Sequence, residues 1–297
     1  MKLPVGPSDY YELFPSGDHQ SGDIWTDLPT HGVLADARLP CVVITPACDL
    51  VNRKVETVTY LPILGVGTYL TSRSHLPEIL RTINGQLKAC GLEITNGEYF
   101  ETSFPRLEDV QRIKNLWAEY SLGRLNAKQK TAAERAGAGL GAIMEMFAGN
   151  RNVSLVQNLK TLFGEKDFAA TARKLVTNSH RTDLHFLPDD GQVKAWTIIG
   201  EPSIALFRYP LSIPIDVLDL AQTVSESSWG TEVVRLRAFY PCVDALTTSR
   251  PLKALRIRPR IMSDLLTRFT ALYGRLGSPD FTDGTIDRYV NQIEGLT

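Results

Sequence analysis

Short apolar runs separated by turn residues fill the first third of the chain. One run spans residues 23–28 and stops at Pro29, a second spans 41–45, and apolar residues alternate with others over 55–61. Such runs are typical of β-strands, and strands this close in sequence favour an antiparallel meander that curls into a barrel. Because proline lacks the N–H group that a strand ladder needs, Pro62 is expected to limit or distort the third strand.

The spacing of the apolar positions becomes helical between residues 76 and 180. Apolar residues from 107 to 120 recur at steps of three and four, which predicts a helix with one apolar stripe. Further helices are expected over 127–147 and 167–176. The small residues of 136–142 would destabilise an exposed helix, so they indicate close packing of helix backbones. Residues 76–180 are therefore predicted to form a helical insertion.

Strand patterns return after this helical segment. They cover 184–187, 195–199, 204–209 and 233–239, with turn residues such as Pro-Asp-Asp-Gly between them. The segment 204–209 is placed where a closing barrel strand would be expected after a large insertion.

A strong amphipathic helix is expected near the end of the chain. Pro259 is placed to start it and Gly277 to end it. Together these patterns predict an α+β protein in three parts. The first part of a barrel lies in 1–75, the helical insertion in 76–180, and returning strands with the C-terminal helix in 181–297.

Composition narrows the class of protein without giving a function. The chain has 297 residues, of which 43% are hydrophobic and 22% charged, and its formal net charge is −1. These values are typical of a soluble globular protein, and any attraction to nucleic acid must come from a local patch. No stretch approaches the ~20 apolar residues that a membrane span needs, so no membrane contact is expected.

The first residues and the cysteines bear on where the protein works. Pro4 and Pro7 interrupt the N-terminal segment, which has no long apolar core and so lacks the pattern of a secretory signal peptide. The cysteines are few and unevenly spaced: Cys41, Cys48, Cys90 and Cys242. This spacing favours reduced thiols over a disulfide framework, so a cytoplasmic location is expected.

Two short segments resemble the MazF/PemK toxin family. Gly22-Asp23-Ile24-Trp25 is similar to the opening Gly-Asp-Ile/Val strand of that family. Arg38-Leu39-Pro40-Cys41-Val42-Val43-Ile44 is similar to its Arg-Pro-Val-x-Val-Ile segment, with Leu39 between the arginine and the proline. The resemblance implies an SH3-like antiparallel β-barrel that interacts with RNA. It also implies a metal-independent endoribonuclease of a bacterial toxin or defence system, without a cofactor, in which Arg38 is the catalytic arginine.

The chain departs from this family at the catalytic hydroxyl. The position falls at 61–64, which reads Leu-Pro-Ile-Leu, and the nearest threonines, Thr59 and Thr68, are out of place. The departure and the large insertion favour a second hypothesis. In it the protein is a non-catalytic adaptor of a bacterial defence or stress complex, and its partner is an antitoxin-like or defence-system protein.

Cys48 and Asp49 form a further candidate site, since they follow a buried-type strand and precede a charged turn. A thiol here would be a nucleophile if a base activated it, and His31 on the preceding loop is one candidate. That arrangement would make the protein a cysteine-dependent hydrolase. Asp49 would assist proton transfer in the ribonuclease hypothesis. In the alternative, the cysteine packs in the core and Asp49 bonds to turn amides.

The spacing of possible metal ligands gives only a weak indication of a metal site in this sequence. His180, Asp183 and His185 lie close together, but spacing does not fix a third ligand for Asp183 and His185, and no CxxC pair is present. Histidines on an exposed loop are the simpler interpretation, so no metal site is predicted.

Basic residues gather near the end of the chain. Between Arg235 and Arg275 there are nine basic residues and two acidic ones. Arg256, Arg258 and Arg260 alternate with other residues and are expected to line one strand face that binds nucleic-acid phosphates. The alternative is an edge strand whose charges are exposed to solvent.

Overall fold

Antiparallel strands from both halves of the chain build one sheet. The computed structural model describes residues 6–15, 17–30, 34, 38–92, 100, 105–149, 153–192, 197–246, 249–274 and 282. The order across the sheet is β1 (Tyr11–Leu13), β8 (Lys253–Ile257), β2 (Asp23–Pro29), β3 (Arg38–Val43), β4 (Thr57–Gly65), β6 (Ser203–Leu206) and β5 (Leu184–Leu187), with β7 (Leu211–Pro214) also on β4. The expected α+β class with an antiparallel sheet is confirmed.

The sheet curls but does not close, so the expected closed barrel is not formed. Among the described residues no ladder joins β1 to β5; side chains bridge them instead. The hydroxyl of Tyr10 donates to the carbonyl of Phe186 at 3.2 Å, and that of Tyr11 donates to the carbonyl of Pro188 at 2.8 Å. Side chains of α11 (Pro259–Tyr273), among them Met262, pack into the interior of the curl. A helix therefore fills the space that strand closure would occupy.

Pro62 lies inside β4 and does not end it, contrary to expectation. The amide of Thr59 donates to Oγ1 of Thr45 beside β3, so alternation turns the backbone nitrogen of Pro62 to the opposite edge. On that edge β7 pairs with β4 up to Tyr60, and β6 pairs with it from Ile63. Pro62 therefore lies where β4 changes partner, and its missing N–H costs little.

The outer face of the curled sheet is covered by short helices. They are α9 (Ile215–Thr223), α10 (Glu226–Arg235), η2 (Leu236–Ala238) and η3 (Pro241–Leu246). The prediction of a strand over 233–239 is therefore wrong, because these residues belong mainly to the end of α10 and to η2. Ser225 caps α10, and Trp229 and Val233, one turn apart, bury the same side of it. The indole N–H of Trp229 donates to the carbonyl of Leu246 at 2.7 Å.

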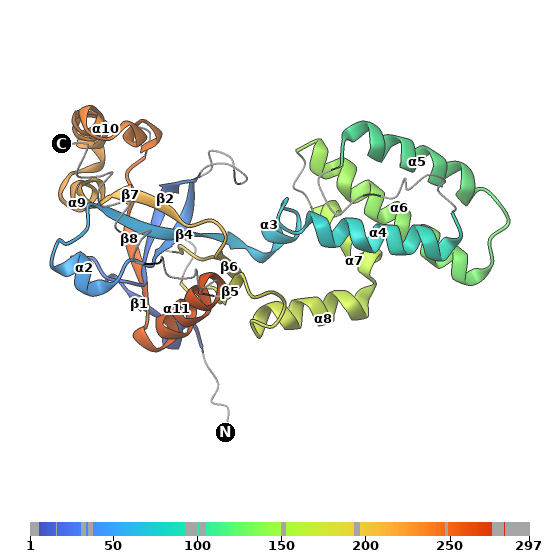
Figure 1. Cartoon of the computed structure of the whole chain (residues 1–297), viewed down its shortest axis with the longest axis horizontal. Helices are drawn as coiled ribbons and strands as arrows, with labels where there is room; N and C mark the ends of the chain where they lie inside the picture. Colours follow the sequence, from blue (N-terminus) through green and yellow to red (C-terminus); the bar gives the residue numbers. More distant parts are fainter. Residues whose placement is uncertain are drawn as a thin grey trace, which may run out of the picture.

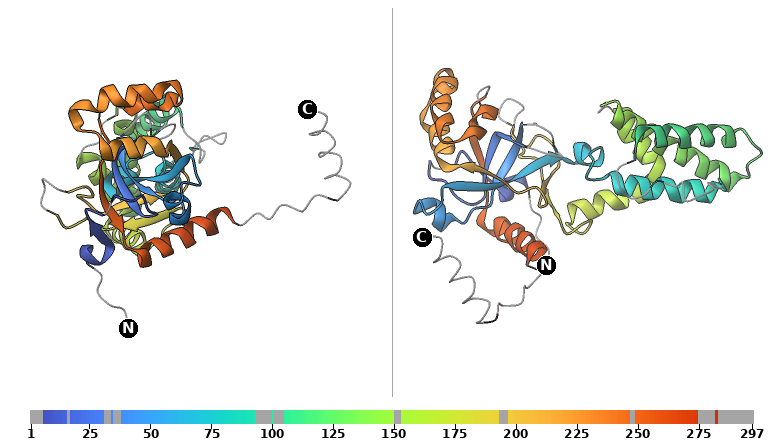
Figure 2. Two further views of the ribbon diagram at one scale, coloured as in Figure 1. Left: turned by 90° about the vertical axis from the view of Figure 1, so that its left-hand side faces the viewer. Right: turned by 45° about the horizontal axis from the view of Figure 1, so that its top comes forward.

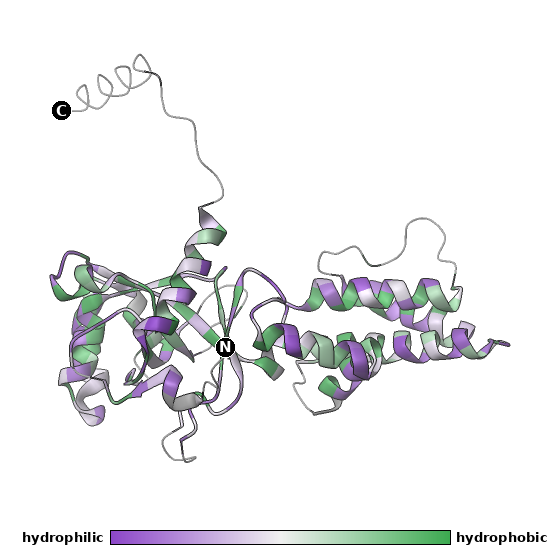
Figure 3. Cartoon of the chain, turned by 90° about the horizontal axis from the view of Figure 1, so that it is seen from below, coloured by the Kyte–Doolittle hydropathy of each residue, from purple (hydrophilic) through white to green (hydrophobic). Residues whose placement is uncertain are grey.

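A bundle of helices projects from the sheet (Figures 1 and 2). Its helices are α4 (Leu76–Cys90), α5 (Leu107–Ser121), α6 (Ala127–Phe147), α7 (Val153–Phe163) and α8 (Glu165–Val176). Their apolar faces share one core, and Figure 3 shows polar residues, in purple, beside apolar ones along the same helices. The helices expected over 107–120, 127–147 and 167–176 are confirmed.

The remaining elements are short: α1 (Pro7–Tyr10), α2 (Ala47–Val51) and α3 (Val66–Leu70). The expected final helix is confirmed as α11, although it ends at Tyr273 and Gly277 lies outside the described residues. The strand expected over 184–187 is confirmed. The strand expected over 195–199 is not formed in its described part, 197–199, and residues 195 and 196 lie outside the described residues. None of the described helices is long and apolar enough to cross a membrane.

The small residues of α6 allow the close packing that the sequence predicts. A Cβ atom at Gly139 would lie 2.5 Å from Cγ1 of Ile83 and 2.9 Å from Cδ1 of Leu162. Gly139→Ala is therefore expected to lower the free energy of unfolding by about 1–3 kcal/mol through overpacking. The control is Gly85→Ala on the exposed side of α4, where a Cβ meets nothing within 4 Å and alanine should stabilise the helix by up to about 1 kcal/mol. Urea titrations measure the free energy of unfolding of both variants. A change of the same sign in the two variants would contradict this packing.

Candidate functional site

A cavity of about 660 Å³ lies where the helical bundle joins the sheet. Its walls come from the start of α4, the end of α8, the start of β5 and the turn after β6. In the described part of the chain, two carboxylates, Glu78 and Asp183, line it. Its basic lining residues are Arg73, Arg81, Lys174, Arg181 and Arg208. We call this space the junction cavity. Its arginines and lysine outnumber its carboxylates by five to two, so its net charge is positive.

Asp183 holds two of these arginines in place. The carboxylate accepts hydrogen bonds from Arg181 at 2.6 and 2.8 Å and from Arg208 at 2.6 Å, and it is only 4% exposed. Burial raises the pKa of Asp183, but the two guanidinium groups outweigh it and hold the pKa below its usual value. Arg181 also donates to the carbonyl of Ser74 at 2.9 Å. These bonds connect the segment before α4, the segment before β5 and the turn after β6, and so fix this wall of the junction cavity.

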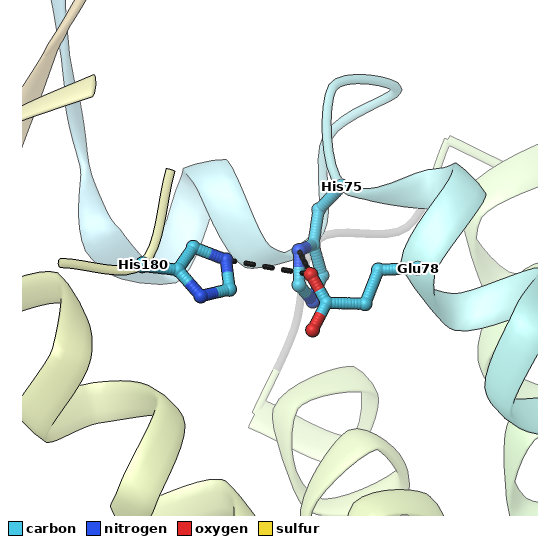
Figure 4. A group of neighbouring side chains, drawn as sticks. All are labelled: His75, Glu78 and His180. Atoms are coloured by element: carbon cyan, nitrogen blue, oxygen red, sulfur yellow. Dashed lines mark ion pairs between the residues drawn. The ribbon is translucent and has the colours of Figure 1, made fainter. Parts of the chain in front are cut away.

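His75, Glu78 and His180 meet beside the cavity (Figure 4). His75 precedes the first turn of α4 and Glu78 lies within that turn, three residues on, so both point to the same side. His180 comes from the segment between α8 and β5. Oε2 of Glu78 lies 3.6 Å from Nδ1 of His75 and 3.4 Å from Nε2 of His180.

His75 is the most buried member of this group, with 1% of its surface exposed. Its ring packs against Tyr69 and Phe163, with ring centroids 5.4 and 5.9 Å away. Burial lowers the pKa of His75 to about 4, against the opposing effect of Glu78. The neighbouring His180 lowers the pKa of Glu78 below its usual value. At neutral pH the group thus offers a neutral imidazole and a carboxylate, both of which are metal-ligand forms.

The histidines considered in the sequence do not come together. His180 joins His75 and Glu78, Asp183 binds the two arginines, and His185 is buried against Phe207 with ring centroids 6.3 Å apart. Sequence reasoning missed His75 and Glu78. Their signal is a histidine and a glutamate three residues apart at a helix start.

Arg38 is the first residue of β3, and the Cys48–Asp49 pair follows the other end of that strand. Arg38 donates to Oγ of Ser249 at 3.0 Å and to the carbonyl of Ala245, so it connects the start of β3 to the end of η3 and to Ser249. A strand of this length separates its ends by about 17 Å. The exposed thiol of Cys48 lies 3.5 Å from Oδ1 of Asp49 on α2. His31 lies outside the described residues. The structure therefore does not gather Arg38, Cys48 and Asp49 into one site.

Arg256, Arg258 and Arg260 do not line one strand face either. Arg256 is buried in β8, where it pairs with Asp23 of β2. Arg258 follows the strand and precedes α11, and Arg260 lies in the first turn of that helix. Arg256 is therefore part of the core and is not available to a phosphate.

No family model, curated protein or solved structure matches this chain. The function is therefore inferred from the geometry of the junction cavity and from the sequence.

Proposed function

We propose that the protein binds RNA and that phosphates of the RNA occupy the junction cavity. The observation that carries the proposal is the gathering of five basic side chains, in the described part of the chain, around one cavity with two carboxylates. Arginine donates in a planar fork that matches phosphate oxygens, and a recessed cationic site concentrates anions. The resemblance of residues 22–25 and 38–44 to MazF/PemK proteins is the reason for naming RNA among phosphate ligands.

The walls of the cavity add features that suit a single strand. Tyr209 lines it, with its hydroxyl 3.0 Å from Oγ of Ser74, and offers an aromatic ring beside the basic groups. Basic residues beside aromatic ones are the usual means of holding single-stranded nucleic acid, since the first bind the backbone and the second stack on bases. Asp183 keeps Arg181 and Arg208 in fixed positions, which lowers the entropic cost of binding.

Removing two exposed charges from the cavity tests the proposal. Arg81→Ala with Lys174→Ala is expected to weaken binding of a single-stranded RNA roughly tenfold at low salt. The slope of log affinity against log salt should fall by about 1.4, or ~0.7 for each lost phosphate contact. Fluorescence anisotropy with labelled RNA over a series of salt concentrations measures both.

The matched control is Lys128→Ala with Lys130→Ala, two exposed positions on α6 that do not line the cavity. It removes the same amount of positive charge, so an equal loss of RNA affinity in the control would mean that binding depends only on the net charge of the protein. If the unchanged protein binds no RNA at low salt, the adaptor hypothesis is favoured, and it predicts a defined protein that copurifies with the chain.

Cleavage of RNA stays a prediction of the family resemblance. The assay is incubation of single-stranded RNA with the protein in EDTA, beside Arg38→Ala, which should lose activity if Arg38 is the catalytic arginine. Because Arg38 contacts Ala245 and Ser249, the variant must also keep its thermal unfolding midpoint. If the RNA stayed intact, the nuclease hypothesis would be wrong, and the proposal of RNA binding would be unaffected.

A further inference from the structure

We infer that His75, Glu78 and His180 form a site for a divalent transition-metal ion, with Zn²⁺ as the best match. In tetrahedral zinc with bonds of about 2.0–2.1 Å, neighbouring ligand atoms are roughly 3.3 Å apart. Oε2 of Glu78 is 3.6 Å from Nδ1 of His75 and 3.4 Å from Nε2 of His180, so both separations fit one shared ion. The ligand atoms of all three residues lie within 4.8 Å of one another, and Nε2 of His180 is also buried without a hydrogen-bond partner among the described residues.

The burial of His75 is a second and independent observation. Neither of its ring nitrogens has a hydrogen-bond partner among the described residues, although the side chain is inaccessible to solvent. Buried polar groups in folded proteins nearly always have a partner, and an orphan indicates a water or an ion. A metal bound to one ring nitrogen would satisfy this imidazole.

The ligand types decide the class of metal. Mg²⁺ and Ca²⁺ prefer oxygen ligands, whereas two imidazoles and one carboxylate favour Zn²⁺. Three protein ligands leave a fourth position open, as in catalytic zinc sites. Glu78 and His180 line the junction cavity, so that position would face it and accept water or an anionic oxygen. An anion there would offset the repulsion between the metal and the basic residues of the cavity.

The three ligands come from both ends of the helical insertion. His75 and Glu78 stand where the chain enters the bundle, and His180 stands where it leaves. A bound ion would therefore tie the two connections together and stabilise the junction. Binding of an ion to the folded state alone raises the unfolding midpoint in proportion to the logarithm of free metal.

The test measures metal on the full chain without RNA, so its outcome is separate from that of the proposed function. Protein stripped with EDTA is titrated with ZnSO₄ by calorimetry, and bound metal is counted by mass spectrometry after desalting. About one Zn²⁺ per chain is expected, with a higher thermal midpoint. Glu78→Gln and His180→Ala should each weaken zinc binding roughly tenfold or more, since even second-shell changes cost that much.

Cys48→Ser is the control, because its thiol is exposed and a thiolate is itself a zinc ligand. It should retain the affinity of the unchanged protein. The visible spectrum of Co²⁺ in place of Zn²⁺ should report a tetrahedral site that Glu78→Gln abolishes. Equal zinc affinity in Glu78→Gln, His180→Ala and the unchanged protein would overturn the inference, and so would the absence of binding at micromolar zinc.

Discussion

Arg256→Ala is expected to lower the free energy of unfolding by about 3–5 kcal/mol, the cost of leaving one member of a buried ion pair without its partner. Asp23 has 0% of its surface exposed and Arg256 has 6%. Nε of Arg256 lies 2.6 Å from Oδ1 of Asp23, while Nζ of Lys253 is 3.6 Å from Oδ2. Without Arg256 the carboxylate keeps the hydrogen bond from the amide of Gln20 at 2.8 Å, and Nζ of Lys253 at 3.6 Å remains as a cationic neighbour. A urea titration followed by tryptophan fluorescence measures the change.

Arg260→Ala is the matched control for Arg256→Ala. Arg260 is exposed in the first turn of α11, where a positive charge opposes the helix dipole, so its removal should be neutral or slightly stabilising. Effects of similar size in the two variants would contradict a structural role for the buried pair. At temperatures where Arg256→Ala is folded, its RNA affinity should match that of the unchanged protein.

The second large effect is a dependence of stability on pH that comes from His185. Both ring nitrogens of His185 are buried without a hydrogen-bond partner among the described residues. Burial lowers its pKa from 6.5 to about 4; the carboxylate of Asp264, at 3.9 Å, opposes this shift, and Arg268 adds to it. The unfolded chain therefore binds more protons than the folded protein between about pH 4 and 6.5. The stabilising contribution is complete above pH 6.5 and is lost as the pH falls to about 4, a change of about 3 kcal/mol.

His185→Leu isolates this contribution, because leucine is similar in volume and does not titrate. The difference in unfolding free energy between the variant and the unchanged protein should grow in favour of the variant by about 3 kcal/mol from pH 6.5 to 4. His75 titrates in the same range and is present in both proteins, so the difference excludes it. Parallel stability curves across this range would show that His185 does not carry the effect.

Local patterns in the sequence were sufficient to predict four of the helices, α5, α6, α8 and α11. The apolar stripe of 107–120 and the boundaries of 127–147 match α5 and α6, because apolar spacing and an Asn126 cap act within one helix. The same reasoning failed over 233–239, where two adjacent valines and two arginines give a false alternation. There Trp229, four residues before Val233, sets the helical face that the core requires.

The candidate site could not be predicted, since its parts meet only through tertiary structure. His75 and His180 stand at opposite ends of the insertion, and spacing along the chain gives no indication of their meeting. Arg256 shows the same difficulty on a strand. Alternation predicted a charged face in solvent, but the register places Arg256 directly across from Asp23, and the pair is buried. Which face of a strand is covered depends on its neighbours.

Photocrosslinking of a 4-thiouridine-labelled single-stranded RNA, with the attached peptides mapped by mass spectrometry, tests RNA binding in the junction cavity most directly. The account predicts crosslinks within residues 73–81, 174–184 or 206–209, which form its walls. These crosslinks should fade with salt and in the Arg81→Ala, Lys174→Ala double variant. Crosslinks confined to Arg258, Arg260 and the rest of α11, or to α2 beside Cys48, would contradict it and place the RNA on another surface.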